Sequence, residues 1–128
     1  MTDIQEFIEL EMAKPFKWAD TCCCMTADRW IKARSGLSPI QNYGRKYDCE
    51  SDAKRWMSER GGLLYAILTV MRSSGLSSTE SPLEGDVGII ELKDKLCMAI
   101  FTGERWFSRD ESGFIFAKRD RFVRAWSV

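Results

Sequence analysis

Three consecutive cysteines, Cys22, Cys23 and Cys24, are the residues of this sequence best suited to chemistry. They stand at the start of a predicted helix, where free backbone N–H groups and the helix macrodipole stabilise a negative charge. A thiolate in such a position is the nucleophile that cysteine hydrolases use. The 128 residues contain no histidine, the side chain that most often takes the proton from such a thiol. The sequence thus offers a candidate nucleophile without its usual base.

Cys22 is the cysteine of this run that we expect to face a groove. On a helix it lines up with Thr26 and Arg29, away from the centre of the apolar stripe. The stripe consists of Cys23, Cys24, Ala27, Trp30 and Ile31. Cys23 and Cys24 are therefore predicted to be core residues, whereas Cys22 is either a nucleophile position or a small packing residue.

Two aspartates and the tryptophans are further candidates, each with a structural alternative. Asp20 precedes the helix and is either a cap or a substitute acid or base. Asp86 either orients a catalytic partner or belongs to a turn that enters a strand. The five tryptophans are either core residues or the lining of a sugar-binding groove, and Trp106 with Phe107 is the pair that we expect to be exposed.

The remaining cysteines, Cys49 and Cys97, stand alone in the sequence. Adjacent cysteines on a helix point in different directions, so this spacing does not favour a disulfide framework. A structural zinc site needs a Cys-x-x-Cys pair that is answered by a second pair or by histidines. We therefore expect reduced thiols, no bound metal ion and no cofactor.

Helices are predicted for the first part of the chain. The helix with the cysteines should run from an N-cap at Thr21 to about Ser35, with Gly36 after its last turn. A preceding helix over residues 3–13 should begin with a capping box formed by Thr2 and Gln5. After a loop at 36–50, the pattern predicts a helix at 51–60, a buried helix at 63–72 and a surface linker at 76–84.

From Gly85 onward the apolar period becomes that of β-strands. The predicted strands are residues 86–92, 96–102, 105–107, 114–117 and 122–128. We therefore predict one α+β domain over residues 1–128, in which N-terminal helices pack on a C-terminal antiparallel β-meander. Its helical part covers about 1–75, its linker 76–84 and its β part 85–128.

Composition excludes several classes of protein. Nineteen basic and nineteen acidic residues cancel, so no overall field favours nucleic acid as a partner. The first twelve residues carry acidic side chains and no basic one, unlike a secretion signal, and no apolar run is long enough to span a membrane. We expect a soluble protein that is made in the cytoplasm and has no membrane span.

A series of short motifs runs along most of the chain: Trp18, Thr21-Cys22, Ala27-Asp28, Gly61-Gly62, Gly85-Asp86-Val87, the run from Ala99 to Gly103, and Ala125 to Val128. Together these motifs give the chain a resemblance to the NlpC-type cell-wall peptidases, which have a papain-like fold. It is most similar to a small branch encoded in phage and prophage tail-gene clusters, whose members tend to end in Ala-Trp-x-Val.

The resemblance implies a papain-like NlpC-type fold, in which a cysteine on a helix packs against an antiparallel sheet that carries the histidine. Cys22 matches the family nucleophile, and Thr21 stands where the family often has aspartate. Cys97 occupies the position expected for the catalytic histidine. A third polar residue belongs on the next strand, around residues 106–108, and the sequence does not assign it.

Three functions follow from this resemblance. The preferred one is a catalytically degenerate domain that acts as a structural or adaptor component of a phage tail tip, with other tail-tip or hub proteins as partners and the virion as its location. The second is an active cysteine peptidase that cleaves peptidoglycan peptides, with Cys22 as nucleophile and Asp20 as substitute base. The third is a module that binds peptidoglycan without cutting it.

Overall fold

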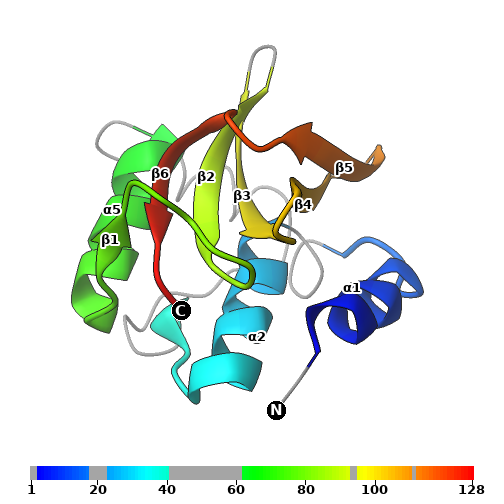
Figure 1. Ribbon diagram of the computed structural model, residues 1–128, viewed down its shortest axis with the longest axis horizontal. Coiled ribbons are helices and arrows are strands. Elements are labelled where there is room, and N and C mark those ends of the chain that lie inside the picture. The colour runs from blue at the N-terminus through cyan, green and yellow to red at the C-terminus, as the bar shows by residue number, and fades with distance from the viewer. Residues whose placement is uncertain (1–2, 18–22, 41–61, 93–94, 111) are drawn as a thin grey trace.

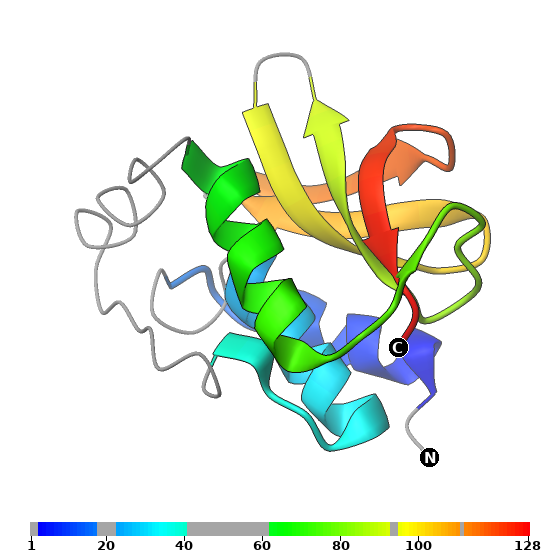
Figure 2. The same cartoon turned by 90° about the vertical axis from the view of Figure 1, so that its left-hand side faces the viewer.

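The computed structural model describes residues 3–17, 23–40, 62–92, 95–110 and 112–128. In these residues, three α-helices lie on one side of a six-stranded antiparallel sheet (Figures 1 and 2). The predicted α+β class is thereby confirmed. The predicted helix at 51–60 and the predicted N-cap Thr21 lie outside the described residues, as do Trp18, Trp56 and Cys49.

Helix α1 (Ile4–Met12) has Asp3 as its N-cap, with the side chain accepting a hydrogen bond from the Gln5 backbone N–H at 3.3 Å. The prediction of a capping box by Thr2 and Gln5 is therefore wrong in its cap residue. Aspartate is short enough to reach the second N–H of the helix from extended backbone, which is the geometry of Asp3. The helix buries Ile4, Phe7 and Ile8 at helical spacing.

Helix α2 (Cys23–Ser35) ends where the sequence predicts, whereas α5 (Gly62–Ser74) continues two residues beyond its predicted end at residue 72. Gly36 and Gly75 follow them with φ of 81° and 83°, a conformation that glycine adopts without steric cost. Three residues of the predicted stripe on α2 are almost completely buried, namely Ala27, Trp30 and Ile31. Local periodicity therefore located the inner face of α2 correctly.

The sheet has the strand order β1-β6-β2-β3-β4-β5. The hairpin-connected strands are β2 (Val87–Leu92), β3 (Lys95–Phe101), β4 (Arg105–Asp110) and β5 (Gly113–Lys118). After β5 the chain crosses to the other side of the sheet, where the last strand, β6 (Phe122–Trp126), pairs with β2. The prediction of a simple meander is therefore corrected, because in this position β6 buries Ala125 and Trp126 in the core.

The predicted surface linker contains a two-residue strand, β1 (Ser78–Thr79), which pairs with the end of β6. Just before β1, the Ser77 carbonyl oxygen accepts a hydrogen bond from the Ser127 N–H at 2.8 Å. A serine-rich segment gives no apolar alternation, so its sequence does not predict a strand. It becomes one because the edge of β6 offers unpaired backbone groups.

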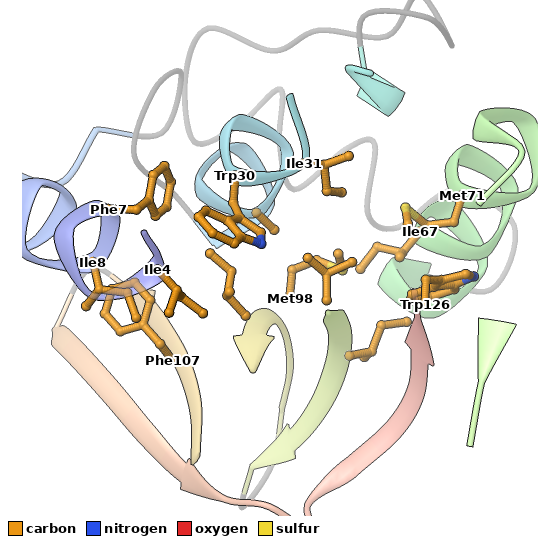
Figure 3. Close-up of a cluster of buried hydrophobic side chains, with 14 residues drawn as sticks. Ile4, Phe7, Ile8, Trp30, Ile31, Ile67, Met71, Met98, Phe107 and Trp126 are labelled. Carbon is orange, nitrogen blue, oxygen red and sulfur yellow. The ribbon is translucent and has the colours of Figure 1, made fainter. Parts of the chain in front are cut away.

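Both faces of the sheet are apolar, and each belongs to a separate cluster of buried side chains. The helix-side cluster lies between the helices and the sheet and includes Met98, Ile100 and Phe107 (Figure 3). The opposite-face cluster contains Ile90, Cys97, Ala99, Phe101, Trp106, Ala117 and Ala125. Successive residues of β3 thus alternate between the two clusters, as the pleat of a strand requires.

Trp106 and Phe107 are 0% and 1% exposed, so the expectation that this pair is exposed is wrong. The two side chains point to opposite faces of β4, and each face is covered. The Trp106 ring packs between Phe101 and Phe122, with ring centroids 4.8 and 5.6 Å apart. The adjacent turn had suggested exposure, but burial here depends on partners from distant strands.

Candidate functional site

The cysteine run begins one residue before the described part of α2. Cys22 and Asp20 lie outside the described residues, so the nucleophile position and its possible substitute base are not located. Cys23 opens α2, and its Sγ lies 4.0 Å from Sγ of Cys24. Both are partly buried thiols that pack against the helix-side cluster, as their predicted core role requires.

Cys97 lies within β3, opposite Ile90 of β2, and is 3% exposed. Its side chain belongs to the opposite-face cluster, against which Cys23 also packs. Helix α2 lies against β3 and β4. The structure therefore brings the cysteine-bearing end of α2 to the cluster that contains Cys97, although these residues are far apart in sequence.

The surroundings of Cys97 are unlike those of a general base. Its cluster consists of aliphatic and aromatic side chains, with Phe101 and Trp106 as the largest members. A thiol is a weak hydrogen-bonding group and, unlike neutral imidazole, is already protonated near neutral pH when unperturbed, so it does not readily accept a proton. In this environment Cys97 serves packing.

Ser108 is the polar residue of β4 in the region where the sequence left the third site residue unassigned. It is 3% exposed, and its hydroxyl donates a hydrogen bond to the Met98 carbonyl oxygen at 2.6 Å. This bond joins β4 to β3 beyond the pairs Ile100 with Phe107 and Phe101 with Trp106. The Ser108 hydroxyl is thus engaged in holding the two strands together.

Asp86 belongs to the turn that enters β2, in agreement with the structural alternative for this residue. It is 5% exposed, and its Oδ2 accepts a hydrogen bond from the Leu83 N–H at 2.8 Å. Its Oδ1 accepts one from the Val128 N–H at 3.1 Å. Both carboxylate oxygens therefore bind backbone and fix the last residue of the chain beside the start of β2.

A small apolar cavity of about 30 Å³ lies between α2, α5 and β3, with Cys24 and Met98 in its wall. Asp28 also lines it, but the Asp28 carboxylate accepts hydrogen bonds from the Ser38 hydroxyl at 2.6 Å and from the Ile40 N–H at 2.9 Å. A space of this size accommodates about one water molecule. It offers no room for a sugar ring or a peptide.

A buried ionic cluster, which the sequence did not predict, joins α1 to its neighbours. Glu11 is 1% exposed, and its carboxylate binds the Arg29 guanidinium at 2.6 Å and the Lys14 ammonium at 2.5 Å. Arg109 of β4 donates hydrogen bonds to the carbonyl oxygens of Glu11 and Lys14, each at 3.0 Å. The cluster fastens the end of α1 to α2 and β4. Its only sequence signal is that Glu11 shares the inner face of α1 with Phe7 and Ile8.

Metal ligation and membrane insertion find no support in the described residues. Among them, no group of three or more histidine, cysteine or acidic side chains has the arrangement of a metal site. Within the same residues, no helix has the length and hydrophobicity needed to cross a membrane.

Comparison with known proteins gives a family but no activity. A family model described as a domain of unknown function, DUF6950, matches residues 1–128. No curated protein and no solved structure matches the chain.

Proposed function

The chain belongs to the DUF6950 family, and we propose that it is a catalytically silent domain of the papain-like NlpC type that serves as a structural or adaptor component of a phage tail tip. The proposal joins the sequence resemblance to the arrangement of α2 and β3. It has two parts: the domain has lost peptidase activity, and it keeps a structural or adaptor role.

The arrangement of the helix and the sheet supports the relation to papain-like domains. In that group a cysteine near the start of a helix faces a strand of an antiparallel sheet. Here α2 begins directly after Cys22 and lies against β3, and Cys23 packs on the cluster that contains Cys97. Cys97, which occupies the position expected for the catalytic histidine, thus lies on β3, a strand that contacts α2.

The observation that supports the proposed loss of activity is the burial of Cys97, which is 3% exposed within an apolar cluster. Amide hydrolysis by a thiol needs a base for the nucleophile and an acid for the leaving amine, and such help contributes about 10² to 10⁴ in rate. A buried thiol provides neither, and the chain has no histidine elsewhere. A side chain that packs well but does no proton transfer is expected where catalysis has been lost.

A structural role is further supported by how the terminal motif is used. Trp126 is 5% exposed in the helix-side cluster, and the Val128 N–H is bound by Asp86. The Ala-Trp-x-Val segment shared with the tail-gene branch therefore stabilises the fold in this chain. The presence of this segment is consistent with a domain whose role depends on a stable fold. The proposed place in a tail tip rests on the sequence resemblance.

The proposal is tested by incubating the purified protein with peptidoglycan and measuring newly released amines. We expect no release above that of the Cys22→Ala variant, with Cys24→Ala as a matched substitution at a neighbouring thiol. Release that disappears only in Cys22→Ala would establish an active peptidase. Sedimentation of the intact protein with peptidoglycan, without release, would instead establish a binding module.

The adaptor role needs its own measurement. The proposal predicts that particles of a phage or prophage whose genome encodes this chain contain it in fixed stoichiometry by quantitative mass spectrometry, and that labelling places it at the tail tip. Particles of normal composition that lack the chain would overturn the tail assignment.

A further inference from the structure

Strand β5 ends the sheet, and its outer edge has no neighbouring strand among the described residues (Figure 1). The Thr102 N–H binds the Arg105 carbonyl oxygen at 2.8 Å, which sets the alternation of backbone groups along β4. Trp106 therefore directs its N–H and C=O groups toward β5. Its register partner on β5 does the same in return, so the alternate residues Phe114 and Phe116 direct their backbone groups outward.

The same two residues expose aromatic surface on the helix side of the sheet. Phe114 and Phe116 are 38% and 46% exposed, and their rings lie 6.2 and 5.4 Å from that of buried Phe107. The Arg109 guanidinium lies 4.8 Å from the centre of the Phe114 ring. Aromatic side chains beside an unpaired strand edge form a surface that proteins normally cover.

A pair of cations continues this row of side chains. Lys118 of β5 lies directly opposite Arg105 of β4, on the same face as Phe114 and Phe116. Both cations are exposed, and neither forms an ion pair with an acidic residue in the described part of the chain. Like charges directly opposite each other destabilise a sheet, so this pair gains from a negative charge that a partner supplies.

The exposed charged residues at this end of the hairpin are mainly basic. They are Glu104, Arg105, Lys118, Arg119, Asp120 and Arg121. Glu84 lies near Gly103 in the turn before β4, and its carboxylate makes no ion pair with these cations. Along its helix side, the edge of β5 therefore presents two aromatic positions and then a basic one.

We propose that the outer edge of β5 binds an extended, acidic segment of another protein as an added strand. On the helix side, this segment places apolar side chains beside Phe114 and Phe116 and a carboxylate beside Lys118. In the antiparallel direction its pattern is acidic-x-apolar-x-apolar. The backbone groups of Phe114 and Phe116 supply hydrogen bonds, and the side-chain positions supply specificity.

The β5 edge of a second copy does not have this pattern. On the helix side that edge carries Lys118 and no carboxylate, because Asp110 of β4 projects from the other face. The Asp110 carboxylate also accepts hydrogen bonds from the Ser112 and Gly113 N–H groups, at 2.8 and 3.1 Å. The acidic strand is therefore expected from a different protein, whether or not the cysteine run is catalytic.

Fluorescence anisotropy on the full chain tests the charge preference. The probe is a fluorescein-labelled peptide, Glu-Thr-Val-Thr-Val-Thr-Glu, which has the same pattern in both strand directions. At about 0.15 M salt it should bind with a dissociation constant below about 1 mM. The same peptide with lysine in place of both glutamates should bind at least about fivefold more weakly. Equal binding of the two peptides, or binding of neither, would overturn the proposal.

Lys118→Glu tests which cation reads the acidic residue. This variant, at an exposed position, should bind the lysine peptide more tightly than the glutamate peptide, because the charge beside the added strand is reversed. Arg124→Glu makes the same charge change on β6, away from the β5 edge, and should keep the preference of the wild type. Circular dichroism should report an intact fold for both variants. A preference that Lys118→Glu leaves unchanged would count against this register.

Hydrogen exchange followed by nuclear magnetic resonance tests the place of binding. The glutamate peptide should slow exchange of the Phe114 and Phe116 amides at least about tenfold and leave that of Val123, exposed on β6, unchanged. If these two amides are already protected in a dimer of the free protein, a second copy covers the edge. If a single-stranded DNA oligonucleotide displaces the peptide and binds more tightly, the surface serves nucleic acid. Either result would overturn the proposal.

Discussion

The indole N–H of Trp30 donates a hydrogen bond to the carbonyl oxygen of Gly85 at 2.7 Å, and both groups are buried. Gly85 precedes the turn residue Asp86, and its own N–H binds the Phe101 carbonyl oxygen at 2.8 Å. One side chain of α2 therefore holds the entry to the sheet. Any larger residue at position 85 would direct its Cβ into the Arg34 guanidinium, and the φ of 93° also favours glycine.

Trp30→Phe should lower the free energy of unfolding by about 2 to 4 kcal/mol, because it leaves a buried carbonyl unpaired and removes ring volume. Urea denaturation followed by circular dichroism measures the change. Trp126→Phe loses a similar ring area, but the structure gives its indole no hydrogen-bond partner within the described residues, so it is the matched control. Equal losses in the two variants would contradict a special role for the Trp30 bond.

Glu11→Gln should destabilise the protein by about 1 to 3 kcal/mol, since the amide removes the charge that binds Arg29 and Lys14 at a buried position. The partly exposed cations can still reach water, which limits the loss. Glu6→Gln makes the same chemical change at an exposed position of α1 and should be nearly neutral. Chemical denaturation of both variants at one salt concentration measures the free energy of unfolding. If Glu11→Gln leaves that free energy unchanged, the ion pairs of Glu11 only compensate for the water that the carboxylate loses on burial.

Asp86→Asn should cost about 1 to 3 kcal/mol, because the amide has one acceptor oxygen where two N–H groups now bind. The change should also loosen the segment around Val128, so the Val128 amide should exchange with solvent deuterium faster than in the wild type. Asp120→Asn, at an exposed turn position, is the control. Unchanged exchange would indicate that the contact between Asp86 and Val128 does not hold this segment.

Cys97 should react with an alkylating reagent at least about 10² times more slowly in the native protein than in urea, because its thiol is reached only by opening of the sheet. Cys23 and Cys24 are partly buried and should be modified sooner. Peptide mapping by mass spectrometry over a time course resolves the sites. Rapid native labelling of Cys97 would contradict the packing role that the proposed loss of catalysis requires.

Features that depend on neighbouring residues could be predicted from the sequence. The spacing of Ala27, Trp30 and Ile31 indicated the inner face of α2, and Gly36 indicated the end of that helix. The change of period at Gly85 indicated that helices precede strands. These predictions succeed because helix and strand periodicity, and the backbone freedom of glycine, are local properties.

The meeting of distant segments, by contrast, is a property of the folded chain. Folding placed β6 beside β2, turned Ser78 and Thr79 into a strand, buried Trp106 and joined Glu11 to Arg29. It also set Cys97 in the cluster against which Cys23 packs, while the role of Cys22 remains a prediction from sequence. Pairing of distant strands and burial of a charge depend on which surfaces are left to cover, and no short window of sequence contains that information.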